Sequence, residues 1–457
     1  MGFFQSRRPI RSRREHTRGI DVPVMISAHG LGGAKDLPIP AEYAVAGACA
    51  ALGVSFIVLA LAWTEPRFGR DTVQPDEAGA PGGPWSGPIL RLLGFAFFLY
   101  VAFAAVFGAD TLINPVFGVF YVLLWVGIVP LSLAFGPVYR ALSPARTLNW
   151  ALAKLSGGDP ELGIREYPAR LGYWPAALGL VAFLWMELIF PGNTDLGNVR
   201  LWLAAYVGVM LIGGAIYGNT FFARADPFEV YSTLVGHLSP LWRVGGRLRL
   251  VNPFRHLATI PVHPGLLAVC AVLLGSTAYD SLSGTEFWLT RTQDLALSRQ
   301  LVSLIGMVGL IAVVAALFAG ATMLTGVHDG HQRRALPQAF AHTIVPIVVG
   351  YVFAHYVSML VEGGQRTLIQ LSDPLSNGAN VLGLSGLGVN YWLSLHPTFL
   401  AVTKVLAVVT GHVIAVIAAH DAAVRLLPRK HQLSGQLPLL FVMVIFTAGG
   451  LALLFGL

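Results

Sequence analysis

The chain has 457 residues, of which 55% are hydrophobic and only 12% are charged. Because about a quarter of the residues in a soluble domain are charged, this composition excludes a water-soluble globular fold. The formal net charge of +7 does not indicate nucleic acid as a partner, since the Lys and Arg residues lie in short loops between apolar segments. Both cysteines, Cys49 and Cys270, fall inside apolar segments, so no disulfide framework is expected.

Ten apolar segments follow one another along the chain, and each approaches the 20 or so helical residues that cross a bilayer. They cover residues 41–63, 88–108, 115–138, 172–190, 200–222, 263–283, 300–325, 338–361, 397–425 and 437–457. This pattern predicts an all-α fold, a polytopic bundle of about ten transmembrane helices in the cell membrane, with the lipid bilayer as its partner. Residues 40–457 form one helical membrane domain, preceded by a basic tail and extracytoplasmic segment at 1–39.

Lys and Arg are distributed unevenly over the loops between these segments. Eighteen lie on one set of alternate loops, and only Arg200, Arg291, Arg299 and Arg366 lie on the other. Since cytoplasmic loops carry the positive excess, the richer set is predicted to be cytoplasmic and both termini to lie outside. Six arginines near the N-terminus would then also lie outside. Translation from Met25 would remove them, and both explanations stay open.

The first half of the chain contains an internal repeat of a helical hairpin, at about 88–165 and 170–240. Its most regular feature is a capping residue followed by proline, a pair that starts a helix cleanly. These pairs are Ser143-Pro144, Asp226-Pro227 and, as a partial third copy, Asn252-Pro253. The segments that follow, 144–155 and 227–237, are predicted to lie along the cytoplasmic interface. Such repeats occur in transporters and equally in structural scaffolds.

Ionisable side chains inside apolar segments are costly and are functional candidates by default. One group is predicted to lie in the outer half of the membrane or near its middle: Glu187, Asp280, His355, Lys404 and His412. Glu362 follows His355 by seven residues, about two helical turns, so both lie on one face. Carboxylates and imidazoles at one depth suit a divalent metal such as zinc, with one position left for water or substrate. They suit a proton or ion pathway equally well.

A second group lies toward the cytoplasm and consists of His342, His420 and Asp421. Pro346 predicts a kink beside His342, because proline lacks the amide that would bond the His342 carbonyl. Histidines matched in depth on adjacent helices can ligate a haem. Two stacked haems would need a matched upper pair, but His355 lies about six residues shallower than His412 on ideal helices. Hydrogen-bonded structural histidines therefore explain this group better than haem does.

Four short motifs stand out along the chain: AHGLGG at 28–33, DLPIP at 36–40, NPFR at 252–255 and AYDSLS at 278–283. In these motifs the chain resembles actinobacterial membrane proteins named fenitrothion hydrolases. The resemblance runs from about residue 28 to the end of the chain. It implies a membrane-bound hydrolase that cleaves organophosphate triesters, together with a partner membrane subunit.

The first histidine of some members of that family directly follows a cleaved signal peptide. Its terminal amine and imidazole then form a good copper-chelating pair. The matching residue here is His29, and this sequence departs from the pattern because no apolar signal region precedes it.

Together with the resemblance, the outer group of ionisable residues predicts a phosphotriester hydrolase in which a zinc or copper ion activates water. Asp280, His355 and His412 are the predicted metal ligands. Glu362 is the predicted base, and Lys404 is placed to stabilise phosphoryl charge. Secondary candidates are Glu187, His29, His342, His420 and Asp421. The alternative is a transporter or metal-handling permease that uses the same groups. A pocket that opens only outward would favour chemistry, whereas a continuous water-filled route through the bundle would favour transport.

Overall fold

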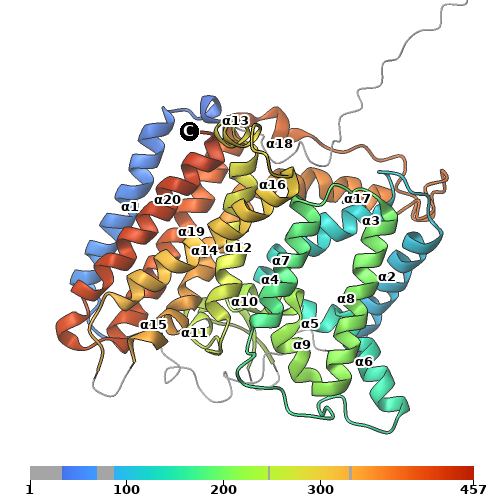
Figure 1. Cartoon of the computed structure of the whole chain (residues 1–457), viewed down its shortest axis with the longest axis horizontal. Coiled ribbons are helices and arrows are strands. Elements are labelled where there is room, and N and C mark those ends of the chain that lie inside the picture. The colour runs from blue at the N-terminus through green and yellow to red at the C-terminus, as the bar shows by residue number, and fades with distance from the viewer. Residues whose placement is uncertain (1–32, 69–86, 245–246, 329–331) are drawn as a thin grey trace, which may run out of the picture.

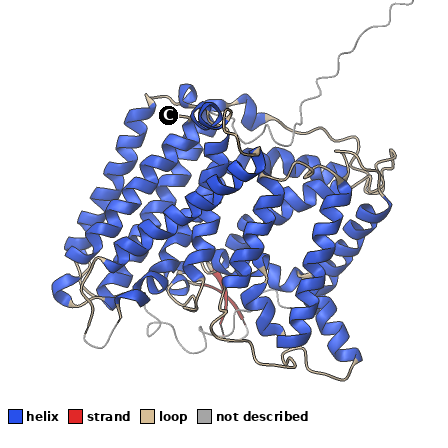
Figure 2. Cartoon of the chain, viewed as in Figure 1, coloured by secondary structure: helices blue, strands red, loops and turns tan. Residues whose placement is uncertain are grey.

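The computed structural model describes residues 33–68, 87–244, 247–328 and 332–457. Their regular secondary structure is almost entirely helical, with one small β-hairpin (Figure 2). The N-terminal tail lies outside the described residues, and so does His29, one of the secondary site candidates.

Nine described helical runs are long and apolar enough to cross a membrane. They are α1 (Ala41–Ala62), α2 (Pro88–Phe107), Pro115–Phe135, α8 (Leu196–Tyr217), α12 (Leu266–Ser283), α14 (Arg299–Met323), Arg333–Gln370, α19 (Pro397–Leu426) and Ser434–Phe455, which includes α20 (Leu437–Phe455). The predicted span at 172–190 is a shorter apolar helix, α7 (Trp174–Leu188), of 15 residues. The prediction of an all-α polytopic bundle is confirmed.

Two of the nine runs contain a π-helical segment. The first consists of α3 (Pro115–Phe117), a π-helix η4 (Gly118–Gly127) and α4 (Ile128–Phe135). The second contains η5 (Arg333–Ala335), α15 (Leu336–Phe340), a 3₁₀ segment η6 (Ala341–Ile344), α16 (Val345–Ser358), a π-helix η7 (Met359–Gly363) and α17 (Gly364–Gln370). The 3₁₀ segment contains His342 and ends two residues before Pro346, so the backbone is irregular where the sequence predicts a kink.

Short elements close the two ends of the bundle. One end holds the 3₁₀ turn η2 (Ala34–Asp36), α13 (Glu286–Thr292), α18 (Trp392–Leu395) and the C-terminus. The other end holds α11 (Pro253–Leu257), α15 and the hairpin of β1 (Leu241–Val244) and β2 (Arg247–Leu250), in which Leu241 faces Leu250. Two further 3₁₀ turns, η8 (Arg429–His431) and η9 (Ser434–Gln436), lead into α20. Figure 1 shows that α1 begins at the same end as the C-terminus.

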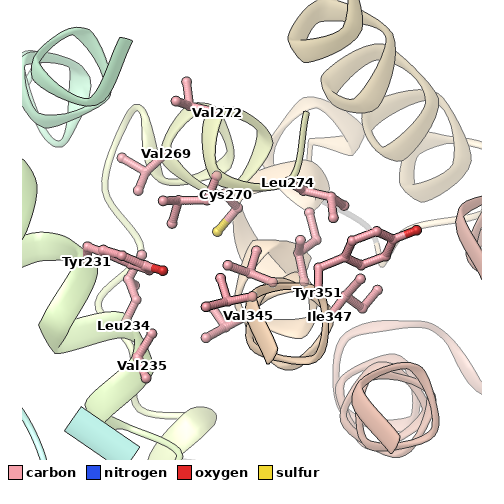
Figure 3. Close-up of a cluster of buried hydrophobic side chains, with 14 of the residues drawn as sticks. Tyr231, Leu234, Val235, Val269, Cys270, Val272, Leu274, Val345, Ile347 and Tyr351 are labelled. Atoms are coloured by element: carbon pink, nitrogen blue, oxygen red, sulfur yellow. The ribbon is translucent and has the colours of Figure 1, made fainter. Parts of the chain in front are cut away.

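Helix α12 lies in the interior of the bundle, packed against α7, α14 and α16. Its apolar window is 67% buried inside the protein, compared with 17% for α14, whose remaining surface faces outward. Figure 3 shows Val269 and Cys270 of α12 among side chains from α10 (Pro227–Gly236), such as Leu234, and from α16, such as Val345. Outward-facing apolar surface on α1, α2, α8 and α14 is what a lipid-facing layer requires. The chain is therefore a multi-pass membrane protein.

The capping pairs predicted from the repeat start helices as expected. Ser143 Oγ accepts from the Arg146 amide before α6 (Pro144–Leu155), and Asp226 Oδ1 accepts from the Phe228 amide before α10. Asn252 does the same for α11. The preceding short helices are α5 (Tyr139–Leu142) and α9 (Asn219–Ala225).

The two copies differ in where the capped helix packs. Helix α6 exposes Trp150 and Leu155, as an interfacial helix would. Helix α10 is buried over nearly its whole length and packs against α4 and α7. The prediction that 227–237 lies along the interface is therefore wrong, because α10 fills the space between those helices.

Candidate functional site at one end of the bundle

A cavity of about 760 Å³ lies at the end of the bundle that holds α13, α18 and the C-terminus. Its walls come from the ends of α7, α12 and α20 and from the two π-helical segments η4 and η7. Its polar side chains include Glu187, Asp280, Ser281, His355, Glu362 and Arg366. Apolar side chains such as Val122, Leu454 and Phe455 also line it. This volume lies in the range of about 300–1,000 Å³ that suits a small organic ligand.

His355 is held at the cavity wall by two neighbouring residues of α12. Its Nε2 lies 2.9 Å from Asp280 Oδ2, and its Nδ1 lies 3.1 Å from Ser281 Oγ. Tyr356 Oη donates to the same Asp280 oxygen at 2.8 Å. The His355 side chain is only 5% exposed and that of Asp280 13%. The interlock between α12 and α16 therefore fixes both the position and the orientation of the imidazole.

Glu362 reaches the same cavity from the π-helix η7. Ser394 of α18 donates its backbone amide to Glu362 Oε1 at 3.0 Å, and its hydroxyl lies 2.7 Å from both carboxylate oxygens. The prediction that Glu362 and His355 share a face is confirmed, since both line the cavity. The π-helices η4 and η7 pack against each other beside it. Such segments are frequent at functional sites.

Glu187 closes the cavity on the α7 side. One of its carboxylate oxygens, Oε2, is buried and has no hydrogen-bond partner among the described residues. Its backbone carbonyl accepts from Asn193 Nδ2 at 2.8 Å, and the Asn193 carbonyl accepts from Tyr121 Oη at 2.7 Å. The loop after α7 is therefore tied down beside the cavity, which Glu187 lines.

Two residues predicted for the same site lie elsewhere. Lys404 does not line the cavity; it is buried in α19, within electrostatic range of Asp36 in η2. His412 is fully buried, and its Nδ1 lies 2.9 Å from the Val408 carbonyl oxygen, one turn earlier in the same helix. Its ring packs edge-on against Tyr351. These side chains do not reach the cavity, because they face other neighbours of α19.

The side chains of the inner group of ionisable residues form hydrogen bonds with other parts of the protein. His420 Nδ1 lies 3.0 Å from Gln436 Oε1 and its Nε2 lies 2.9 Å from the Trp63 carbonyl oxygen, so both ring nitrogens are engaged. Asp421 Oδ1 accepts from the backbone amides of Arg67 and Phe68. These two residues anchor the segment that follows α1. His342 Nδ1 contacts the Ala339 carbonyl oxygen in its own helical run. None of the three lines the cavity.

The chain matches no known protein family, no characterised protein and no solved structure. The resemblance to fenitrothion hydrolases therefore stays an expectation from the short motifs.

The fit of a metal ion can be tested on the cavity residues. Among the described residues, no three or more His, Cys, Asp or Glu side chains are arranged to hold a metal ion. Asp280 and His355 offer two ligand atoms 2.9 Å apart, whereas a catalytic zinc usually takes three protein ligands. The described part of the chain thus supplies only part of a catalytic zinc site.

Ser281, Arg366 and Ser394 are among the polar cavity residues that were not predicted from the sequence. Ser281 stands beside Asp280 in the motif at 278–283, and this adjacency is the only signal that could have indicated it. Arg366 was counted only as a loop charge, yet it lines the cavity and donates to Tyr391 Oη at 3.1 Å. Ser394 precedes the span at 397–425 and has no sequence signature.

Proposed function

We propose that the protein is a hydrolase of the cell membrane that cleaves a small ester in this cavity, with His355 as the general base. The observation that carries the proposal is the contact of 2.9 Å between Asp280 and His355 at the cavity wall. A carboxylate on one ring nitrogen fixes the tautomer and stabilises the imidazolium that forms when the other nitrogen accepts a proton.

The substrate class that we propose is a neutral phosphotriester, as the resemblance implies. The apolar wall of Val122, Leu454 and Phe455 suits its organic substituents. Arg366 is the Lys or Arg side chain among the described cavity residues, so we assign to it the stabilisation of phosphoryl charge that was predicted for Lys404. A partner membrane subunit belongs to the same proposal.

Confinement of the cavity to one end of the bundle supports chemistry over transport. None of His342, His420 and Asp421 lines it, and the last two serve the segment after α1. Hydrolysis requires only a pocket that opens on one side, whereas transport needs access from both sides.

The test is the hydrolysis of a nitrophenyl phosphotriester by the detergent-purified full chain. The absorbance of the released nitrophenolate measures the rate. We expect His355→Gln to lower kcat by about 10²–10⁴-fold, the usual contribution of a general base. His412→Gln is the matched control, because His412 is equally buried but lies outside the cavity. Equal turnover in the two variants would refute the assignment of His355.

Elemental analysis of the same samples tests the predicted zinc or copper. About one metal ion per unmodified chain, absent from the double variant with Asp280→Ala and His355→Ala, would show that the site binds a metal. Turnover by a metal-free sample would leave His355 as the base.

Cation transport is the second candidate, and the buried Glu187 carboxylate favours it. An unpartnered carboxylate oxygen in a membrane protein is a suitable ligand for a cation. Uptake of a divalent cation into proteoliposomes that is abolished by Glu187→Gln, without any ester hydrolysis by the unmodified chain, would replace the hydrolase proposal by transport.

A further inference from the structure

We infer that Ser281 is a nucleophile that forms a covalent bond with the substrate, an inference that rests on the proposed hydrolytic function. Ser281, His355 and Asp280 stand in a row at the cavity wall, with contacts of 3.1 Å and 2.9 Å on either side of the imidazole. A nucleophile, a base and an orienting carboxylate in this order make up the arrangement of a catalytic triad, which is recognised by geometry rather than by sequence position.

The hydrogen-bond roles along this row follow from what each group can do. An ionised carboxylate only accepts, so the Asp280 contact places the imidazole proton on Nε2. Nδ1 is then an acceptor that faces the Ser281 hydroxyl. His355 is therefore oriented to take the hydroxyl proton, which is the step that activates a serine.

The Ser281 hydroxyl is used differently from other hydroxyls of α12. Ser276 and Thr277 both donate to the Leu273 carbonyl oxygen of their own helix, and Ser283 donates to the Asp280 carbonyl oxygen. Bonding of this kind is the ordinary arrangement for a hydroxyl in a helix. Ser281 instead contacts the imidazole of α16 across a helix interface and lines the cavity.

The reaction has two balanced steps. Ser281 Oγ bonds to phosphorus while its proton moves to His355 Nδ1; the bond from phosphorus to the leaving oxygen breaks, and the leaving group departs with that proton. Water then attacks phosphorus and gives a proton to His355. The bond between phosphorus and Oγ breaks, and Ser281 regains its proton. Arg366 lines the same cavity and can stabilise the charge on the phosphoryl oxygens in both steps.

Covalent labelling of the unmodified full chain tests the inference directly. A fluorophosphonate probe is incubated with the detergent-purified protein, and the adduct is located by intact mass and peptide mapping. We expect one adduct per chain, on Ser281, with labelling at least 100-fold slower in His355→Gln. Ser281→Ala is expected to abolish labelling. Ser276→Ala is the matched control, because it removes a buried hydroxyl of the same helix outside the cavity.

The outcomes separate this inference from the hydrolase proposal. Triester turnover without an adduct on Ser281, or turnover that survives Ser281→Ala, would refute the assignment of Ser281 as the nucleophile. Water would then be the attacking group. An adduct on Ser281 without triester turnover would support the nucleophile and refute the substrate class. Mapping on the unmodified chain does not depend on whether any variant folds.

Discussion

Buried charged side chains in this protein differ in whether their hydrogen bonds are completed by the protein. Arg146 and Glu229 form a fully buried pair in which Nε and a terminal nitrogen of Arg146 donate to the two carboxylate oxygens at 2.9 and 2.7 Å. The same guanidinium also donates to the Asn219 carbonyl oxygen. Glu187, by contrast, keeps a buried oxygen without a partner among the described residues. The first arrangement indicates structure, and the second indicates a site for a ligand.

Replacing only Arg146 should destabilise the protein more than replacing both Arg146 and Glu229. Arg146→Met leaves the Glu229 carboxylate buried and uncompensated, so we expect a loss of about 3–5 kcal/mol in the free energy of unfolding. The double variant with Glu229→Met should recover most of that loss. Thermal unfolding in detergent compares the two variants. A double variant less stable than the single one would show that each side chain acts through other contacts.

The depth of a residue could be predicted from the sequence, but its direction around the helix could not. Each helical residue advances about 1.5 Å along the axis, so counting placed Asp280, His355 and Lys404 in one layer. Which side chains meet depends on which helices are neighbours and how they are rotated, and packing decides both. Asp280 and His355 therefore meet because α12 packs on α16, whereas Lys404 faces Asp36 in η2.

At the scale of elements, apolar runs and capping residues predicted most helix boundaries within a few residues. The caps Ser143, Asp226 and Asn252 are local signals, because each satisfies amides within its own first turn. The two π-helices and the burial of α10 were not predicted. They arise from contacts with distant segments, such as the packing of η4 on η7, which leave no periodic pattern in the sequence.

The histidines packed around the β-hairpin predict a stability that depends on pH. Trp242 of β1 stacks on His256 of α11 with ring centroids 4.2 Å apart and also contacts His237. Burial lowers the pKa of both histidines to about 4, and nearby charge adds to this effect. The ordinary pKa of histidine is 6.5, so above pH 6.5 both rings are neutral in the folded and in the unfolded chain, and their burial as neutral rings has no pH-dependent cost. Stability is lost as the pH falls from about 6.5 to about 4, because the unfolded chain binds protons first.

Replacing one of these histidines tests the effect. We expect His256→Phe, which keeps a ring against Trp242, to lose less stability on acidification, by at most about 1.4 kcal/mol per pH unit. Thermal unfolding between pH 8 and pH 4 gives the comparison, with the values at pH 8 as reference. Identical losses in the two proteins would mean that His256 contributes nothing to acid sensitivity.

At the scale of the whole molecule, the two ends of the bundle are chemically different. One end carries the cavity with Glu187, Asp280 and Glu362, and the other carries Arg255, Arg333 and Arg334 beside α11 and α15. By the positive-inside rule the cavity end is predicted to face outward. Substrate would then reach the cavity from outside the cell or from the outer part of the bilayer.

The most direct test of the account is the turnover of Asp280→Asn on the nitrophenyl phosphotriester. The substitution keeps the size of the side chain but removes the charge that orients and stabilises the His355 imidazole. We expect kcat to fall by about 10²–10⁴-fold while the protein elutes and unfolds like the unmodified chain. An unchanged kcat in a well-folded variant would contradict the proposal that Asp280 and His355 carry out hydrolysis.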